Sequence, residues 1–181
     1  MAGPVTLRSA RLGDADAIAQ IYAHYVTNSA ITFEVEPPSA TEIQKRMKSS
    51  EGLYPWLVAT DGERILGYAY ATQFKARSAY RFSVETTIYL DPAARGQGMG
   101  RTLYAKLIDS LEQQGFASAV ASVTLPNRAS LSLHAALGFR HVGVHRQIGF
   151  KSGWHDVAQL QRLFPISENP TEPVPFGAIL D

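Results

Sequence analysis

The sequence contains no cysteine, so the chain has neither a disulfide framework nor the means to form an acyl-cysteine intermediate. Long apolar runs are absent too: no stretch approaches the roughly 20 residues that a helix needs to span a bilayer. The first residues, Met-Ala-Gly-Pro-Val-Thr, lack the apolar core of a signal peptide. We therefore expect a cytoplasmic protein that does not associate with membranes.

The charges of the two signs nearly balance. The 17 Lys and Arg against 16 Asp and Glu give a formal net charge of +1, and no basic run is interleaved with aromatic residues. Nucleic acid is therefore not expected as a partner. With 181 residues, 45% of them hydrophobic, the chain suits one packed domain. We expect this domain over residues 1–165, followed by a Pro-rich, extended and only partly ordered tail over residues 166–181.

Several common functional motifs are missing as well. The glycine-rich run at residues 95–100 is not followed by Gly-Lys-Ser/Thr, which excludes a Walker loop, and its spacing differs from the dinucleotide motif G-x-G-x-x-G. His141 and His145 have the spacing H-x-x-x-H, but they lie in a strand-like segment without a Glu partner or a third ligand. No metal site is therefore expected. No G-x-S-x-G occurs, which argues against a covalent serine mechanism.

The most informative motif that is present is Arg95-Gly96-Gln97-Gly98-Met99-Gly100. It lies between a strand-like segment that ends at Leu90 and an amphipathic helix that begins near Arg101. Glycines let the backbone approach an anion, and the free N–H groups and the positive dipole end of the following helix point toward it. This run therefore predicts a phosphate site.

Hydrophobic periodicity and turn signals predict the order strand, two helices, three strands, helix, strand, helix and two strands. The expected helices follow residue 14, run from the capping box 39–42 to about 50, and cover 101–115 and 127–138. The expected strands are 5–9, the hairpin 56–60 and 64–72, 82–90, 118–123, 139–148 and 154–164. This order indicates an α/β fold in which helices cover a mixed sheet.

Together these segments resemble a known family. R-x-x-G-x-G at residues 95–100 is similar to the pyrophosphate loop of GNAT superfamily acetyltransferases, and residues 127–139 resemble their later helix, which begins at an Asn and ends in Leu-Gly-Phe. The order of further segments resembles that of phosphinothricin N-acetyltransferase-like proteins: Tyr54-Pro-Trp-Leu-Val-Ala59, Lys75-Ala-Arg-Ser-Ala-Tyr80, Val84-Glu-Thr-Thr87, Glu112-Gln-Gln-Gly-Phe116 and Gly153-Trp-His-Asp156. The resemblance implies a GNAT fold, in which helices flank a central mixed, mostly antiparallel sheet. It also implies direct acetyl transfer from acetyl-CoA to the α-amine of phosphinothricin, methionine sulfoximine or methionine sulfone.

The resemblance also implies where acetyl-CoA binds. Backbone groups of Ile88, Tyr89 and Leu90 should pair with the pantetheine arm as an added strand would. Asn127 should contact the end of that arm. The diphosphate should lie against the glycine-rich run, formed by Arg95, Gly96, Gln97, Gly98, Met99 and Gly100.

Two residues are candidates for proton transfer. Glu85 is the only carboxylate in the strand-like segment 81–90, whose other residues suit a buried sheet, and the resemblance implies that it contacts the substrate amine. A direct and a water-relayed base both remain open, and a structural ion pair is the alternative. His134 stands where many superfamily members have a Tyr that protonates the departing thiolate; the phosphinothricin group has His there. A packed histidine is the alternative.

The acceptor site is expected around a cationic loop. Lys75, Ala76 and Arg77 lie between Phe74 and Tyr80, directly before the strand of Glu85, and two cations there suit a carboxylate or phosphinate. A solvated loop is the alternative. By resemblance Phe33 also lines the acceptor pocket, whereas for Glu34 the resemblance is less specific.

Other functions stay open from the sequence. The acceptor could instead be a polyamine, an aminoglycoside or a protein N-terminus, with the same acetyl-CoA site and a different acceptor pocket. Lys75 and Arg77 argue against a polycation as the acceptor. A non-catalytic acyl-CoA sensor would need neither Glu85 nor His134. The resemblance further implies a two-fold homodimer, for which residues 149–154 are the candidate surface.

Overall fold

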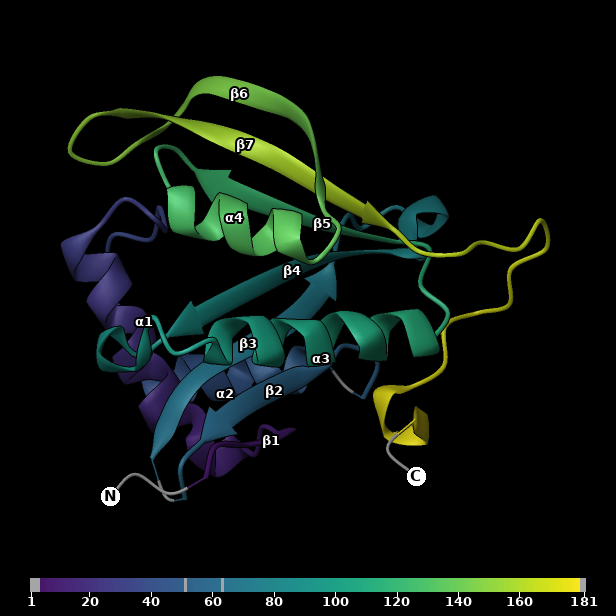
Figure 1. Cartoon of the computed structure of the whole chain (residues 1–181), viewed down its shortest axis with the longest axis horizontal. Helices are drawn as coiled ribbons and strands as arrows, with labels where there is room; N and C mark the ends of the chain where they lie inside the picture. Colours follow the sequence, from purple (N-terminus) through teal and green to yellow (C-terminus); the bar gives the residue numbers. More distant parts are fainter. Residues whose placement is uncertain (1–3, 51, 63, 180–181) are drawn as a thin grey trace.

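The chain forms one mixed β-sheet (Figure 1) in the computed structural model, which describes residues 4–179 except 51 and 63. Across these residues seven strands follow the order β1-β2-β3-β4-β5-β7-β6. Neighbouring strands are antiparallel, apart from the parallel pair β4 and β5. The strands are β1 (Thr6–Ser9), β2 (Trp56–Thr60), β3 (Ile65–Gln73), β4 (Ser83–Leu90), β5 (Ser118–Thr124), β6 (Arg140–Phe150) and β7 (Trp154–Leu163). The expected mixed, mostly antiparallel sheet is confirmed.

Helices cover both faces of this sheet (Figure 1). They are α1 (Ala15–Asn28), α2 (Ala40–Ser49), α3 (Met99–Gln113) and α4 (Arg128–Ala136). On one face, Ile18 of α1 and Ile43 of α2 share a buried cluster with Tyr68 of the sheet. On the other face, Leu107 of α3 belongs to the larger core cluster, and α4 lies on the same side. None of the described helices is both long and apolar enough to cross a bilayer.

The helix ends follow their sequence signals. Ser39 Oγ accepts a hydrogen bond from the amide of Glu42 at 3.2 Å, which is the Ser39 half of the expected capping box. Asn127 Oδ1 accepts from the amide of Ser130 at 3.1 Å and so begins α4. Gly138, which follows the C-cap residue Leu137 of α4, has the expected left-handed backbone with φ +81°. The start of α3 differs from the prediction: the helix begins at Met99 rather than near Arg101, so the glycine-rich run supplies its first residues.

The parallel strands β4 and β5 pair only over their first residues. Their register runs from Ser83–Ser118 to Glu85–Val120, and beyond this point the two strands part. β4 stays paired with β3 as far as Leu90, and β5 stays paired with β7. Within the described residues, the β5-facing edge of β4 after Glu85 therefore has no strand partner.

The tail returns along the domain. It has neither helix nor strand over residues 166–175 and then forms a short 3-10 turn, Phe176–Ile179, in which Phe176 is buried in the larger core cluster. Glu172 pairs with Arg81 at 2.7 Å. Gln114 Nε2 donates to the carbonyl of Val174 at 2.8 Å. The end of the tail is thus held against the domain, while residues 1–3 of the predicted domain and 180–181 of the predicted tail lie outside the described residues.

Candidate active site

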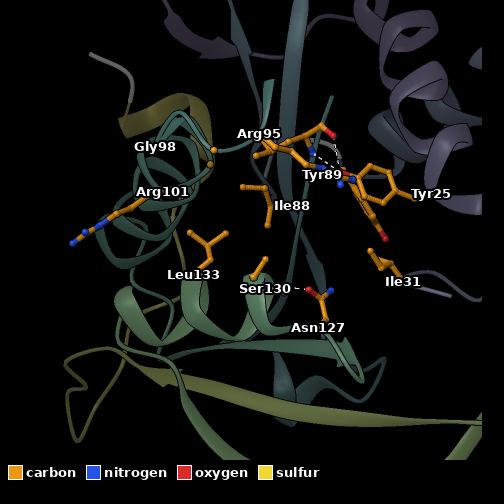
Figure 2. A pocket seen from close by; sticks show the side chains of 14 residues that line it. Tyr25, Ile31, Ile88, Tyr89, Arg95, Gly98, Arg101, Asn127, Ser130 and Leu133 are labelled. Atoms are coloured by element: carbon orange, nitrogen blue, oxygen red, sulfur yellow. Dashed lines mark hydrogen bonds between the residues drawn. The ribbon is translucent and has the colours of Figure 1, made fainter. Parts of the chain in front are cut away.

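A hollow of about 380 Å³ lies where β4 and β5 part (Figure 2). The end of β4, the glycine-rich run and the first turns of α4 form most of its wall. The lining residues are Tyr25, Ile31, Ile88, Tyr89, Leu90, Arg95, Gly96, Gly98, Gly100, Arg101, Asn127, Ala129, Ser130 and Leu133. The structure therefore brings together all the predicted cofactor residues except Gln97, which is exposed, and Met99, which is buried in the core.

The glycines of the run have two different roles. Gly96 and Gly98 have φ of +78° and +76°, and a Cβ on either would meet no atom within 4 Å, so open space lies beside their backbone. Gly98 is also the N-cap of α3 and has no side chain to bind the first amides of that helix. The amide of Arg101 donates to the carbonyl of Gly98 at 3.0 Å, so the amides of Met99 and Gly100 are the ones that face an anion at this helix start. Gly100 instead lets α3 approach β4, because a Cβ there would lie 2.9 Å from Leu90 Cδ1.

Tyr25 holds the end of β4 in place from α1. Its hydroxyl donates to the carbonyl of Leu90 and accepts from the amide of Leu90 at 3.3 Å. Its ring centroid lies 5.0 Å from the guanidinium carbon of Arg95 (Figure 2). The sequence context does not reveal this role, since Tyr25 recurs at helical spacing among core residues. Ser130 and Leu133, by contrast, could have been found from the sequence, because they lie three and six residues after the N-cap Asn127 and so on the same face of the helix.

A smaller hollow of about 90 Å³ adjoins the first and shares five lining residues with it: Ile31, Ile88, Tyr89, Asn127 and Ser130. Polar groups of three elements reach it. They belong to Thr86 and Thr87 of β4, Ser122 and Thr124 of β5, and Ser130 and His134 of α4. This second hollow therefore connects the predicted cofactor region with the sheet around Glu85.

His134 is a member of a buried hydrogen-bonded chain. The side chain is 4% exposed; Nδ1 lies 2.8 Å from the carbonyl of Ser130, and Nε2 lies 3.0 Å from the hydroxyl of Tyr104. Because a carbonyl only accepts, we assign the proton of the neutral ring to Nδ1, so that Tyr104 donates to Nε2. The hydroxyl of Tyr104 also lies 2.7 Å from Thr86 Oγ1. Burial lowers the pKa of His134, although its hydrogen bond to Ser130 acts in the opposite direction.

Glu85 lies at the last position at which β4 pairs with β5. Ser122 Oγ donates to Glu85 Oε1 at 3.2 Å and lies equally far from Oε1 of Gln159 on β7. The side chain is half-buried, whereas its neighbours Val84 and Thr86 are buried. Successive strand residues face opposite sides of the sheet. The expectation of a buried strand thus holds for the face turned toward α3 and not for Glu85 itself.

The cationic loop predicted to bind the acceptor lies near Glu85 along the chain and outside the two hollows. Lys75, Ala76 and Arg77 are exposed in the connection from β3 to β4, at the end of β4 remote from the glycine-rich run. Lys75 Nζ lies 5.0 Å from the ring centroid of Phe74 and 5.3 Å from that of Tyr80. No residue of this loop is among those that line either hollow in the described part of the chain.

Phe33 lies in the connection from α1 to α2. Its ring is packed so closely on the backbone of Gly149 that a Cβ there would overlap it, and it lies 6.1 Å from the ring of His155. Among the described residues, no three or more His, Cys, Asp or Glu are grouped so that they could hold a metal ion.

Residues 7–157 match the family model described as an acetyltransferase (GNAT) domain. The chain belongs to the GNAT acetyltransferase family. It is 41% identical, over 94% of its length and 95% of the relative's, to a phosphinothricin N-acetyltransferase from Streptomyces viridochromogenes. It is 32% identical to an L-methionine sulfoximine/L-methionine sulfone acetyltransferase from Salmonella typhimurium, over 87% and 93% of the two chains. The crystal structure of a phosphinothricin acetyltransferase from Sinorhizobium meliloti in complex with AcCoA superposes with a TM-score of 0.88, at 41% identity and 96% coverage of both chains.

The GNAT fold, the acetyltransferase class and the use of acetyl-CoA expected from the sequence are thereby confirmed. The hollow of this acetyltransferase also fits the co-substrate on its own geometry. The open space at Gly96 and Gly98 and the first amides of α3 suit a diphosphate. Between Glu85 and Leu90, the edge of β4 that faces β5 has no strand partner among the described residues, and it offers backbone groups to the amides of a pantetheine arm; at Leu90 itself the amide and the carbonyl already bond to Tyr25.

Proposed function

We propose that the acetyltransferase transfers an acetyl group directly to the α-amine of an amino-acid analogue such as phosphinothricin, methionine sulfoximine or methionine sulfone. The observation that carries the proposal is the position of Glu85. Its carboxylate lies where β4 leaves β5, between the hollow that suits acetyl-CoA and the cationic loop with Lys75 and Arg77. The similarity to enzymes named for these substrates supports the same acceptor class.

The proposed chemistry assigns the proton of the amine to Glu85. An α-amine arrives largely as an ammonium ion, and it attacks only after losing a proton, which Glu85 takes directly or through one water. Acetyl-CoA supplies the acetyl group as a thioester. The backbone edge from Ile88 to Leu90 orients the pantetheine arm, and Asn127 contacts its end. As the new C–N bond forms the C–S bond breaks, and the leaving thiolate then takes up a proton, for which His134 remains the candidate source.

The acceptor's other end belongs, in this proposal, to the loop from Phe74 to Tyr80. Lys75 and Arg77 are exposed cations one loop away from Glu85, and Arg77 suits the two oxygens of a carboxylate or phosphinate. Ala76, Tyr80 and Phe33 would line the space between the head group and the amine. In this proposal the acceptor extends from the cationic loop to the base Glu85.

We further propose that the enzyme works as a cytoplasmic homodimer, since acetyl-CoA is available in the cytoplasm. Phe150 and Trp154 support a contact surface: they are 66% and 62% exposed, and their rings pack edge to face at 5.3 Å. Ile148 and Val142 on the same hairpin are also exposed. Such an apolar patch favours association. Light scattering at micromolar concentration should give twice the chain mass, and a monomer mass would contradict the dimer.

A panel of amines incubated with acetyl-CoA, with release of free thiol as the readout, tests the acceptor class. Phosphinothricin, methionine sulfoximine and methionine sulfone should react faster than spermidine, an aminoglycoside or a peptide N-terminus. A faster reaction with one of the latter would overturn the acceptor and leave the cofactor site intact. Tight acetyl-CoA binding without thiol release from any amine would instead favour the sensor function.

A further inference from the structure

Lys151, in the turn between β6 and β7, has its ammonium group fully engaged by one segment of the chain. Nζ donates to the carbonyl oxygens of Val26 at 2.6 Å, Thr32 at 3.0 Å and Glu34 at 2.8 Å. An ammonium group has three donors, so every one of them is used. Val26 belongs to the last turn of α1, whose carbonyls lack partners within the helix. A cation there also complements the negative end of the helix dipole.

The segment that Lys151 holds has neither helix nor strand. Residues 29–36 form most of the connection from α1 to α2, and the ammonium group of Lys151 contacts two carbonyl oxygens inside it. The same hairpin holds it a second time, because Gly149 leaves room for the ring of Phe33 directly on its backbone. On the far side, Arg46 grips both carboxylate oxygens of Glu34, at 2.8 and 3.1 Å. The connection is therefore fixed between α2 and the β6–β7 turn.

This connection forms a wall of both hollows. Ile31 lines the large hollow and the small one, and Figure 2 shows it facing the space in front of Asn127. Its carbonyl accepts from Thr124 Oγ1 at 3.5 Å, at the end of β5. A shift of residues 29–36 would thus move Ile31 at the place where the two hollows meet, and would move Phe33 with it.

We propose that Lys151 is a positioning residue for the acceptor: it fixes residues 29–36 as the wall against which the acceptor is held during acetyl transfer. This inference rests on the proposed function for its acceptor class. Lys151 itself does not touch the reacting atoms, because its donors are occupied by backbone carbonyls. Its effect reaches the acceptor through Phe33, and through Ile31 where Ile31 lines the small hollow. Ile31 also lines the large hollow, but the hydrogen bonds of the Lys151 ammonium group end on Val26, Thr32 and Glu34 and not on the glycine-rich run that would hold the diphosphate.

The test compares Lys151→Met with Lys151→Arg, and with Lys106→Met as a control on the exposed surface of α3. Lys151→Met keeps the length of the side chain and removes all three donors. We expect the Michaelis constant for methionine sulfone to rise at least about tenfold with little change in kcat, and the dissociation constant of acetyl-CoA to stay within about twofold. Lys151→Arg, which keeps a charged donor group, should recover part of the loss. Lys106→Met should match the wild type.

Amide hydrogen exchange supplies a readout independent of activity. Exchange over residues 29–36 should accelerate in Lys151→Met, while exchange over β2 and β3 stays at the wild-type rate. Unchanged exchange over residues 29–36 would show that Lys151 does not fix this connection. Faster exchange with an unchanged Michaelis constant for the acceptor would overturn the positioning role. If the wild type acetylated no amine, the proposed function would fail together with the acceptor role of Lys151. The exchange data would still decide whether Lys151 fixes residues 29–36.

Discussion

The hydroxyl of Ser122 on β5 donates to the carboxylate of Glu85 on β4 at 3.2 Å, across the position where the two strands part. That hydroxyl has one proton, and it lies equally close to Gln159, so it serves only one of the two acceptors at a time. Glu85 therefore keeps lone pairs for a second donor. An ammonium group of an incoming acceptor is such a donor, and this is the basis of the first prediction.

Replacement of Glu85 by Gln should lower kcat/KM by roughly 100- to 10,000-fold near neutral pH, because the amide cannot accept the ammonium proton. Activity should recover partly at higher pH, where solvent supplies the free amine. Ser122→Ala, which removes only the hydrogen bond, should cost about two- to tenfold. The pH profiles of the three proteins check this, and full activity of Glu85→Gln at every pH would remove Glu85 from the mechanism.

The glycine-rich run yields a second prediction. Gly98→Val should raise the dissociation constant of acetyl-CoA by at least about tenfold, because the side chain would fill the open space beside an N-cap backbone with φ +76°. Gly115→Val is the matched control: Gly115 has φ +89° and equally open surroundings, at the other end of α3. Both variants should lose similar stability through backbone strain. Calorimetric titration should find weaker acetyl-CoA binding in Gly98→Val alone; equal affinities would place the diphosphate elsewhere.

His134 gives a prediction for stability against pH. Its pKa is lowered in the folded protein, chiefly by burial, from a value of 6.5 in the absence of these effects. As pH falls below 6.5, the unfolded chain takes up a proton that the folded protein does not. The stability present above that pH is therefore lost until the folded pKa is reached, at up to about 1.4 kcal/mol per pH unit. Denaturant unfolding of His134→Gln should lack this loss, and parallel pH curves for the two proteins would contradict it.

Local signals predicted most of the fold. The helix caps at Ser39 and Asn127, the left-handed glycine at Gly138 and the apolar periodicities are short-range features, and the structure has the predicted elements there. The phosphate site at the glycine-rich run could likewise be predicted, because the glycines and the start of the following helix are adjacent in the sequence. The later start expected for α3 was wrong because Gly98 caps a helix without the side chain that usually marks an N-cap. Gln97 and Met99 do not line the hollow, because one is exposed and the other is buried in the core.

Long-range contacts could not be predicted in the same way. Tyr25 reaches Leu90 from 65 residues away, and Lys151 reaches Val26 from 125 residues away. In the sequence, the first looks like one more core aromatic and the second like part of an ordinary turn. Glu85 shows the same limit. The residue types along β4 indicate a buried strand, but the partial exposure of Glu85 depends on where β4 and β5 separate, which is a property of the assembled sheet.

The last prediction concerns selectivity in the loop before β4. Arg77→Ala should raise the Michaelis constant for phosphinothricin and methionine sulfone, since an exposed cation that suits two oxygens of the acceptor is lost. In the wild type these acceptors should outperform methionine at least about tenfold, because polar contacts left unpaired by a thioether cost roughly 1–3 kcal/mol each. Arg77→Ala should reduce that preference and leave acetyl-CoA binding unchanged. Arg140→Ala, on the exposed start of β6, is the control for loss of one positive charge. Equal selectivity in Arg77→Ala and Arg140→Ala would move the head group of the acceptor away from this loop.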